Sequence, residues 1–406
     1  MAPRSRSCAS QAASTPSATR IDALPDLVLV RCLGFLELEE RQRAALVCKR
    51  FAAAACSPEL LRDVKPHVDD DDVPVLLSLA AWLARHGRHV RKLSLVDCAA
   101  FGAVGSSMAT ALATCLATVC SAGQLVELEA GMCRTFHTEW LAVARSLQRL
   151  SLDGCPLHIS PAIAGLTALQ SLQLNGELHF AAGARLPASI SRLVVSSCSM
   201  GRDDMPLQLT QLPRLQRLRL EYCSFVSESL SHLSALAGSL TRLETLLVRD
   251  IPTAGLAALT RLQHLRWSVH DGAAVQSVAG ALPHLTGLTC LSLQWLGVSI
   301  DALLKSNGVL LEATQLQHLG LWGSSVAIDW GSPAAAALFD WLACHPPLRH
   351  LTVDDLISTQ VFATSGFFNH CMQLCRRCPD LLVQWPDLQG EQNETVIRWL
   401  NSQDPF

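Results

Sequence analysis

A nine-residue pattern of hydrophobic and polar positions recurs ten or more times along this chain. Its consensus is Leu-x-x-Leu-x-Leu-x-x-Cys, and it is clearest at residues 90–98, 147–155 and 215–223. Further copies start at Leu125, Leu169, Ile190, Leu243, Leu262, Leu288, Leu316 and Leu348. Consecutive copies begin about 19 to 35 residues apart, a spacing typical of repeats that stack on one another.

Each copy predicts a short strand. Side chains alternate along a strand, so the fourth and sixth positions face one side while the third, fifth and seventh face the other. Val195, Val248 and Val353 are assigned to the sixth position of their copies, where Ala130 and Trp267 fit poorly. One repeat cannot bury its own leucines, whereas stacking removes them from water. We therefore expect an α/β leucine-rich-repeat solenoid, a curved parallel sheet with short helices or loops on its convex side.

The hydrophobic spacing between residues 24 and 64 is different and indicates helices. Leu27, Val30 and Leu33 fall on one helical face, and apolar residues over 44–55 recur at three- and four-residue spacing. About forty residues are too few to bury a complete core. An apolar surface should therefore remain exposed for a partner.

These residues resemble an F-box. The resemblance is carried by Leu24-Pro25, Leu27, Val28, Leu33, Leu36, Leu46-Val47-Cys48-Lys49-Arg50-Phe51 and Ser57-Pro58-Glu59-Leu60-Leu61. In that family the motif is a helical trio that docks on the Skp adaptor of SCF cullin-RING ubiquitin ligases, and a following leucine-rich solenoid holds the substrate. The family pattern departs at Arg41, where a leucine is usual and docking should be weakened, and at Leu61, which replaces a common tryptophan.

The resemblance assigns docking residues by position. They are Leu24, Pro25, Leu27, Val28, Leu33, Val47, Cys48 and Phe51. The alternative for this segment is an N-terminal helical cap of the solenoid.

The pattern divides the chain into three parts. Residues 1–20 are expected to be a disordered tail, with a transit peptide as the alternative; residues 21–66 form the F-box helical domain; residues 67–406 form the solenoid with a helical cap at each end. The run 69–72 of aspartates is expected to cap a helix that continues through Leu83. A final strand is expected near 381–385 and a terminal helix over 393–400.

The concave face, formed by the third, fifth and seventh positions, is the expected binding surface for a protein substrate. Its candidate contact residues are Arg149, Arg192, Arg217, Arg219, Arg249, Arg266 and Trp322. Guanidinium groups match carboxylates and phosphates, so an acidic or phosphorylated target segment is one hypothesis. The alternatives are a merely solvated arginine surface, or a small anionic ligand such as an inositol phosphate by analogy of architecture alone.

Composition narrows the functional classes. A formal charge of −3 gives no reason to expect nucleic acid, and hydrophobic residues, although 50% of the chain, form no membrane-spanning run. Sixteen cysteines recur partly at one repeat position, which favours buried thiols in the reducing cytoplasm or nucleus. His370, Cys371, Cys375 and Cys378 could be read as a metal or redox site, but one buried helix face is favoured, and no cofactor is expected.

No catalytic motif is present: Gly-Lys, HExxH and GxSxG are all missing. The sequence therefore predicts a non-catalytic substrate-recognition subunit that contacts a Skp-type adaptor and a cullin. The alternative is a leucine-rich interaction scaffold with no ligase link, which would be organellar if the first twenty residues were a transit peptide.

Overall fold

The computed structural model of this chain describes the following residues. They are 24–66, 73–95, 106–133, 136–154, 157–197, 208–223, 227–248, 253–269, 272–296, 313–324, 333–345, 347–354, 373–374, 376–378 and 380–384. Several expectations fall outside them: the tail 1–20, the aspartates 69–72, Arg249, the cluster from His370 to Cys375 and the terminal helix 393–400. The chain forms two compact units, Met1–Pro66 and His67–Phe406.

The first unit consists of three short helices and a short extended segment. They are α1 (Asp26–Leu33), α2 (Leu38–Ala45), α3 (Lys49–Ala55) and β1 (Asp63–Val64). Leu29, Leu33 and Ala54 form the buried core, and Phe51 packs against it. Leu29 and Leu33 are four residues apart and therefore share one face of α1. Leu27 and Val28 of α1 lie outside this core and are exposed.

The second unit is a leucine-rich-repeat solenoid, as expected from the repeated pattern. Its helical segments are α4 (Val73–His86), η2 (Gly87–His89), α5 (Ser106–Ser121), η3 (Glu139–Val143), η4 (Pro161–Gly165), η5 (Ser227–Leu236), α7 (Thr253–Ala257), α8 (Gly272–Ala281), η6 (Leu282–His284) and α10 (Pro333–Cys344). Its main strands are β2 (Lys92–Leu95), β3 (Glu127–Cys133), β5 (Arg149–Gly154), β7 (Ser171–Asn175), β9 (Arg192–Ser196), β10 (Arg217–Glu221), β11 (Arg242–Leu246), β12 (His264–Val269), β13 (Cys290–Leu296), β14 (His318–Ser324), β15 (His350–Asp354) and β16 (Leu382–Gln384).

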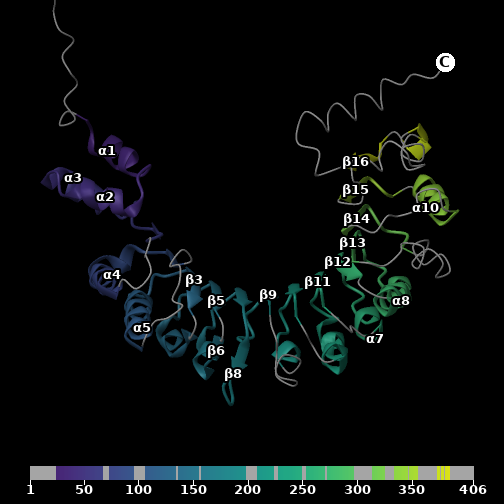
Figure 1. The fold of residues 1–406 in the computed structure, drawn as a ribbon, viewed down its shortest axis with the longest axis horizontal. Helices are drawn as coiled ribbons and strands as arrows, with labels where there is room; N and C mark the ends of the chain where they lie inside the picture. Colours follow the sequence, from purple (N-terminus) through teal and green to yellow (C-terminus); the bar gives the residue numbers. More distant parts are fainter. Residues whose placement is uncertain are drawn as a thin grey trace, which may run out of the picture. The chain divides into compact units, whose positions relative to one another are not determined.

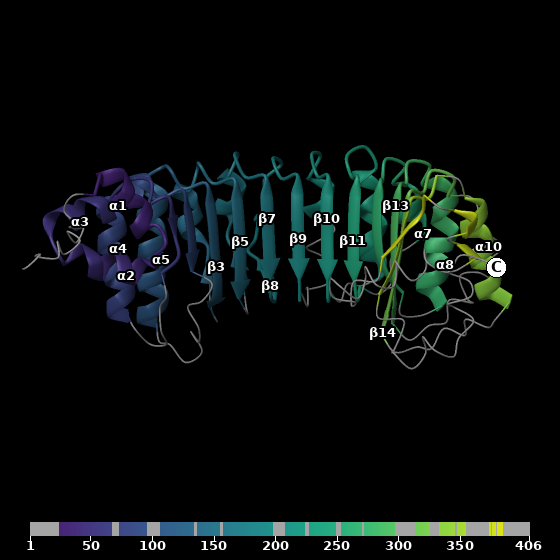
Figure 2. The same cartoon turned by 90° about the horizontal axis from the view of Figure 1, so that it is seen from above.

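These strands are neighbours in the order of the chain, and their pairs are parallel. Within this unit the strands line the concave side while α5, α7 and α8 lie on the convex side (Figure 1). Seen from above, the strands from β3 to β11 lie side by side and point the same way (Figure 2). The leucine-rich period predicts this arrangement, because each strand must return to the same side of the stack.

The solenoid core consists of the fourth and sixth positions of each copy. In β10, Leu218 and Leu220 are buried, whereas Arg217 is exposed and Arg219 is partly exposed. The poor sixth-position fit Trp267 is also buried, in register with Leu293 of β13. The fourth and sixth positions of β10 and β12 are therefore buried as predicted, although two outward positions, the fifth-position Val194 and the seventh-position Ser268, are buried as well.

One copy has a different register from the one that we expected. Leu243 pairs with Leu218, a fourth-position residue, so this copy starts at Leu240 and not at Leu243. Its sixth position is Thr245, which is buried, and Val248 takes the ninth position. The assignment of Val248 to the sixth position is therefore wrong.

A second, smaller parallel sheet was not predicted. It contains β4 (Phe136–His137), β6 (Leu157–Ile159) and β8 (Leu178–Phe180). The buried Thr138 follows β4, and its hydroxyl joins two segments by donating to the His158 carbonyl at 2.9 Å and accepting from the Ser160 N–H at 2.7 Å. The Thr138 side chain therefore continues the hydrogen bonding between β4 and β6 beyond the last backbone pair.

The eighth position of four consecutive copies has a positive φ. The angle is 121° at Gly176, 56° at Ser197, 52° at Tyr222 and 52° at Leu247. In three of these copies the N–H at this position donates to the seventh-position carbonyl of the next copy, at 2.7 to 2.9 Å. The left-handed turn thus adds one backbone hydrogen bond to the pairing between neighbouring strands. Only glycine adopts it without steric cost.

Candidate interaction surfaces

The first unit exposes large apolar side chains. Phe35 is 91% exposed, Leu46 87%, Val47 71% and Leu27 58%, with Val28 at 39%. Single exposed apolar residues are ordinary on protein surfaces, but five in a unit of this size are unusual. The helices therefore present an apolar surface that their own small core leaves uncovered.

Arg50 joins two of the exposed segments. Its Nε donates to Asp26 Oδ1 at 2.8 Å, and its guanidinium also donates to the Leu24 carbonyl. This contact holds the start of α3 against the start of α1. Leu27 follows Asp26 directly and Val47 lies three residues before Arg50, so the exposed residues of α1 and of the α2–α3 turn lie in one region.

Charges alternate along the third-position column at the start of the solenoid. Lys92 Nζ lies 2.6 Å from Glu127 Oε1, and Arg149 donates to Glu127 Oε2 at 3.0 Å. The hydrogen bond with Glu127 is the main reason that the pKa of Lys92 is raised, and its counterpart lowers the pKa of Glu127. Opposite charges directly across a strand pair are favourable.

The same column changes character in the middle of the sheet. Arg192, Arg217 and Arg242 lie directly beside one another on β9, β10 and β11. Arg242 Nε donates to Glu244 Oε1 at 2.5 Å, and Arg219 Nε donates to Glu221 Oε1 at 2.7 Å. Within the described residues, no carboxylate pairs with Arg192 or Arg217.

A hollow of about 170 Å³ lies between these arginines. Four arginines and one carboxylate line it together with the buried fifth-position Val194; they are Arg192, Arg217, Arg219, Arg242 and Glu244. A valine at this position is short, whereas the corresponding residue of β10 is an arginine. The short side chain leaves room between long cationic ones.

Histidines continue the third-position column beyond Arg242. His318 and His350 stack with ring centroids 4.3 Å apart and an interplanar angle of 2°. Burial lowers the pKa of His318, and the nearby His350 and His264 lower it further. The pKa of His264 is lowered by burial and then by Arg242 and Arg217. The lowered pKa values of His318 and His264 favour the neutral imidazole at these two positions.

In the part of the chain that the structure describes, no three histidine, cysteine or acidic side chains are placed to hold a metal ion. No helix of that part combines the length and the apolar character needed to cross a bilayer.

Comparison with known families identifies the first unit. Residues 21–66 match the family described as F-box-like. These residues form an F-box-like domain. No curated protein sequence matches the chain. Among solved structures, an internalin from Listeria monocytogenes is similar at 16% identity and a TM-score of 0.42, over 78% of this chain and 95% of that one.

The F-box-like domain exposes most of the residues that the resemblance assigned to docking. Pro25, Leu27, Val28, Val47 and Cys48 are exposed, while Leu24 and Phe51 are partly buried. Leu33 is 3% exposed and lies in the core, so it cannot touch a partner directly. It can support the predicted docking surface only from behind, and its part in docking stays a prediction.

Two exposed residues were missed as candidate contacts. Leu46 lies in the quoted motif, and its exposure was not foreseen because it follows the last turn of α2, outside the helical periodicity. Phe35 follows Gly34, the residue that caps the end of α1. It lies outside the helix, so hydrophobic periodicity does not predict whether its side chain is exposed. An aromatic residue next to a helix-ending glycine is the one signal that the sequence offers.

Arg41 is turned toward the inside of the F-box-like domain. Its Nη1 donates to the Leu60 carbonyl at 2.7 Å, and burial lowers the pKa of the guanidinium. Leu61, the other departure from the family pattern, is buried. Both residues therefore help to build the domain.

The structure separates the concave-face candidates into three groups. Arg149, Arg192 and Arg217 are exposed at third positions, and Arg219 and Arg266 are partly buried at fifth positions. Trp322 lies on β14, but its side chain is outside the described residues, as is Arg249 as a whole. Arg242 was missed because the copy on β11 was assigned a register three residues too late.

Proposed function

We propose that this protein is the substrate-recognition subunit of an SCF-type cullin-RING E3 ubiquitin ligase. In this proposal the F-box-like domain docks on a Skp-type adaptor, which links it to a cullin, and the leucine-rich repeats bind a target protein. The chain itself performs no chemistry. By holding adaptor and target on one molecule it raises the local concentration of target near the transferring enzyme.

The observation that carries the proposal is the apolar surface of the F-box-like domain. Leu46 and Val47 lie in the turn between α2 and α3, where both are well exposed. Arg50 ties this turn to the start of α1, so that Leu27 and Val28 extend the same region. A surface of this kind is stabilised when a partner removes it from water.

Buried thiols favour the cytoplasm or the nucleus as the site of action. Cys115, Cys120 and Cys223 are buried free cysteines, and burial raises the pKa of Cys120 to about 12. A thiol held protonated in this way is a small apolar packing group. Such packing suits a compartment in which thiols remain reduced.

The docking surface can be tested by co-purification. The full chain carrying Leu46→Glu and Val47→Glu should lose adaptor and cullin by more than about tenfold, because each change places a charge in the apolar contact. The matched control is Leu77→Glu, which changes an exposed leucine of α4 in the solenoid and should leave co-purification intact. Thermal unfolding should be nearly the same for all three proteins, since exposed substitutions alter stability little.

The opposite result has a clear meaning. If the double variant co-purifies with adaptor and cullin as well as the unchanged chain does, this surface is not the docking site. If neither protein brings down a cullin, the interaction scaffold without a ligase link is the better description.

A further inference from the structure

Two departures from the regular repeat coincide on β10 and β11. The first is a group of neighbouring arginines in the third-position column, and the second is a pair of bulky residues in left-handed turns at the ends of the same strands. At the eighth position the two preceding copies have the smaller residues Gly176 and Ser197.

The arginines form the first departure. Earlier in the same column Glu127 lies between Lys92 and Arg149 and pairs with both. On β9 to β11 no acidic residue interrupts the column, so three cations stand directly opposite one another at the strand spacing of about 4.8 Å. Like charges in this arrangement destabilise a sheet. An anion bound between them would reverse the sign of that contribution.

The charges within this cluster leave two arginines uncompensated. Glu221 and Glu244 are held by Arg219 and Arg242, and Glu244 is also 3.6 Å from Arg219. Arg192 and Arg217 remain without a carboxylate among the described residues. Burial lowers the pKa of His264 on β12, and the nearby Arg242 and Arg217 lower it further.

The size of the hollow argues for a single anionic group rather than a whole small molecule. Its volume of about 170 Å³ lies below the roughly 300 Å³ at which pockets for drug-sized ligands begin. Two uncompensated guanidinium groups match a doubly charged anion. Either a phosphate monoester or two adjacent carboxylates would supply that charge.

The left-handed turns form the second departure. At the eighth position the copy on β7 has Gly176, which adopts a positive φ freely, whereas the copies on β10 and β11 have Tyr222 and Leu247. A bulky residue in this conformation strains the backbone, and such strain is concentrated at functional sites. Tyr222 is 55% exposed and Leu247 39% exposed, so burial in the core does not account for either residue.

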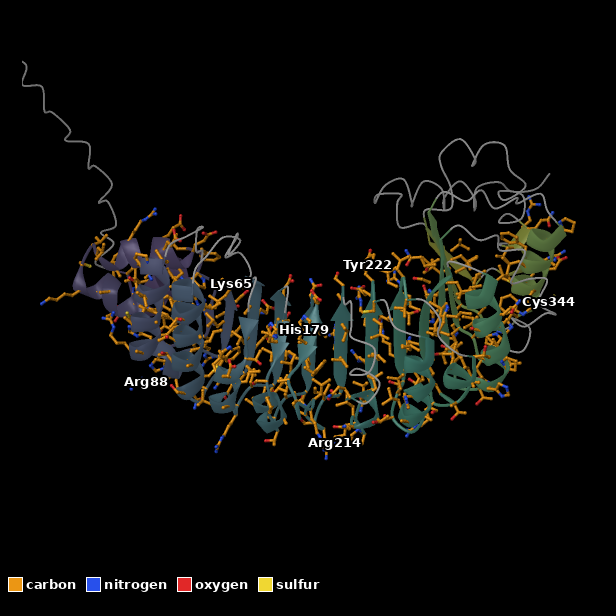
Figure 3. All side chains as sticks on the ribbon, turned by 60° about the horizontal axis from the view of Figure 1, so that its bottom comes forward. Lys65, Arg88, His179, Arg214, Tyr222 and Cys344 are labelled. Atoms are coloured by element: carbon orange, nitrogen blue, oxygen red, sulfur yellow. The ribbon has the colours of Figure 1, made fainter. Side chains whose placement is uncertain are left out.

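These two residues belong to one apolar cluster at the strand ends. The Tyr222 N–H donates to the Leu246 carbonyl at 2.7 Å, which holds Tyr222 beside Leu246 and Leu247. Figure 3 shows Tyr222 at one end of its strand and Arg214 at the other. Tyr222 is the fifth residue after Arg217, which corresponds to a span of about 16 Å along an extended chain.

We infer that β9 to β11 bind an extended peptide segment of the target protein that carries a doubly charged anionic group about five residues from an apolar side chain. The anionic group enters the hollow between Arg192 and Arg217, and the apolar side chain packs on Tyr222 and Leu247. This inference rests on the proposal that the repeats bind a target protein, and it adds the chemistry of that target.

The test uses three immobilised peptide libraries and the full chain. Each library has degenerate flanks around one fixed centre, which is phosphoserine, a Glu-Glu pair or serine. We expect one of the two anionic libraries to retain the chain about tenfold better than the serine library, because hydrogen bonds between charged groups are stronger than hydrogen bonds to a neutral hydroxyl. The better of the two identifies the source of the charge. Sequencing of the retained peptides should show apolar residues enriched about five positions from the centre.

Matched variants separate the two halves of the site. Arg192→Gln with Arg217→Gln should abolish the preference for the anion, whereas Arg185→Gln with Arg214→Gln removes the same charge at other exposed arginines and should preserve it. Tyr222→Gly with Leu247→Gly should keep the anion preference and lose the apolar enrichment. Glycine suits the left-handed turn, so this variant retains its fold.

Equal retention of all three libraries, or of none, overturns the inference. So does an anion preference that survives the loss of Arg192 and Arg217. Adaptor co-purification from the same preparations is unaffected by any of these outcomes, so a failure here is distinct from a failure of the ligase proposal.

Discussion

Two buried threonines use the same hydroxyl group in different ways. Thr138 donates to the His158 carbonyl at 2.9 Å and accepts from the Ser160 N–H at 2.7 Å. Thr245 occupies a sixth position where leucine is usual, and its hydroxyl lies 3.5 Å from the Arg266 carbonyl. The first hydroxyl makes two well-formed hydrogen bonds, while the second lies beyond the normal distance for an O–H donor.

This contrast predicts opposite outcomes for the same substitution. Thr138→Val leaves a carbonyl and an N–H without their partner, so it should lower the free energy of unfolding by about 1 to 3 kcal/mol. Thr245→Val should change it by less than about 0.5 kcal/mol, because little hydrogen bonding is lost and apolar volume is gained. Urea unfolding of both variants measures these free energies. Equal losses of stability would contradict the role of Thr138 as a hydrogen-bonding residue.

The eighth-position turns give a second prediction for single residues. Leu247→Gly should raise the free energy of unfolding by up to about 1 kcal/mol, since glycine relieves the left-handed strain but is more flexible when unfolded. Gly176→Ala should lower it by about 1 kcal/mol or more, because it introduces a side chain where φ is 121°. Calorimetry of the two variants measures both changes, and a loss of stability in Leu247→Gly would show that the leucine is held by packing.

At the level of the element, the sequence predicted strands better than it predicted their register. The copy on β11 contains Leu240, Leu243 and Leu246 at three-residue intervals, so two registers place leucines at the first and fourth positions. The choice between them depends on whether Thr245 or Val248 is buried as the sixth residue. A valine is the better core residue by itself, but pairing with β10 places Thr245 inside.

Helix α1 illustrates the same limit. Its apolar residues cover most of its surface, and periodicity alone assigned Leu27, Val30 and Leu33 to one face. Leu29 and Leu33 define the buried face because α3 packs there, while Leu27 is exposed. In a helix that is apolar on several sides, the packing partner decides which side is inside.

The histidines on β12 and β14 make the solenoid sensitive to mild acid. His264 and His318 have lowered pKa values, so below about pH 6.5 the unfolded chain binds more protons than the folded one. Stability from these groups is therefore complete at pH 7 and above and decreases as the pH falls below 6.5. Glu127, whose pKa is lowered, contributes a separate loss below its ordinary pKa of about 4.5.

Urea midpoints at pH 8, 7, 6 and 5.5 should be flat at first and then fall. The variant His318→Gln should show a smaller fall, since it removes one of the groups that must gain a proton. The unchanged values between pH 8 and 7 serve as the internal control. A midpoint that rises on acidification would contradict the direction of these pKa shifts.

For the whole molecule, the sequence predicted architecture well because both of its patterns are repeated or local. Stacked copies must lie in chain order, and the F-box motif is contiguous, so neither needs knowledge of distant contacts. The small sheet β4-β6-β8 and the exposed Phe35 depend on how loops and helix ends settle after the repeats have stacked. The hydrophobic periodicity of the sequence does not predict such contacts.

The division between buried and outward positions has a consequence for how this protein can change over generations. Arg217 can be exchanged for another polar residue while Leu218 and Leu220 stay buried, because the two sets of side chains lie on opposite sides of the same backbone. New specificities are therefore accessible through single mutations that leave folding intact. A lineage could therefore acquire new binding targets while the F-box-like domain stays the same.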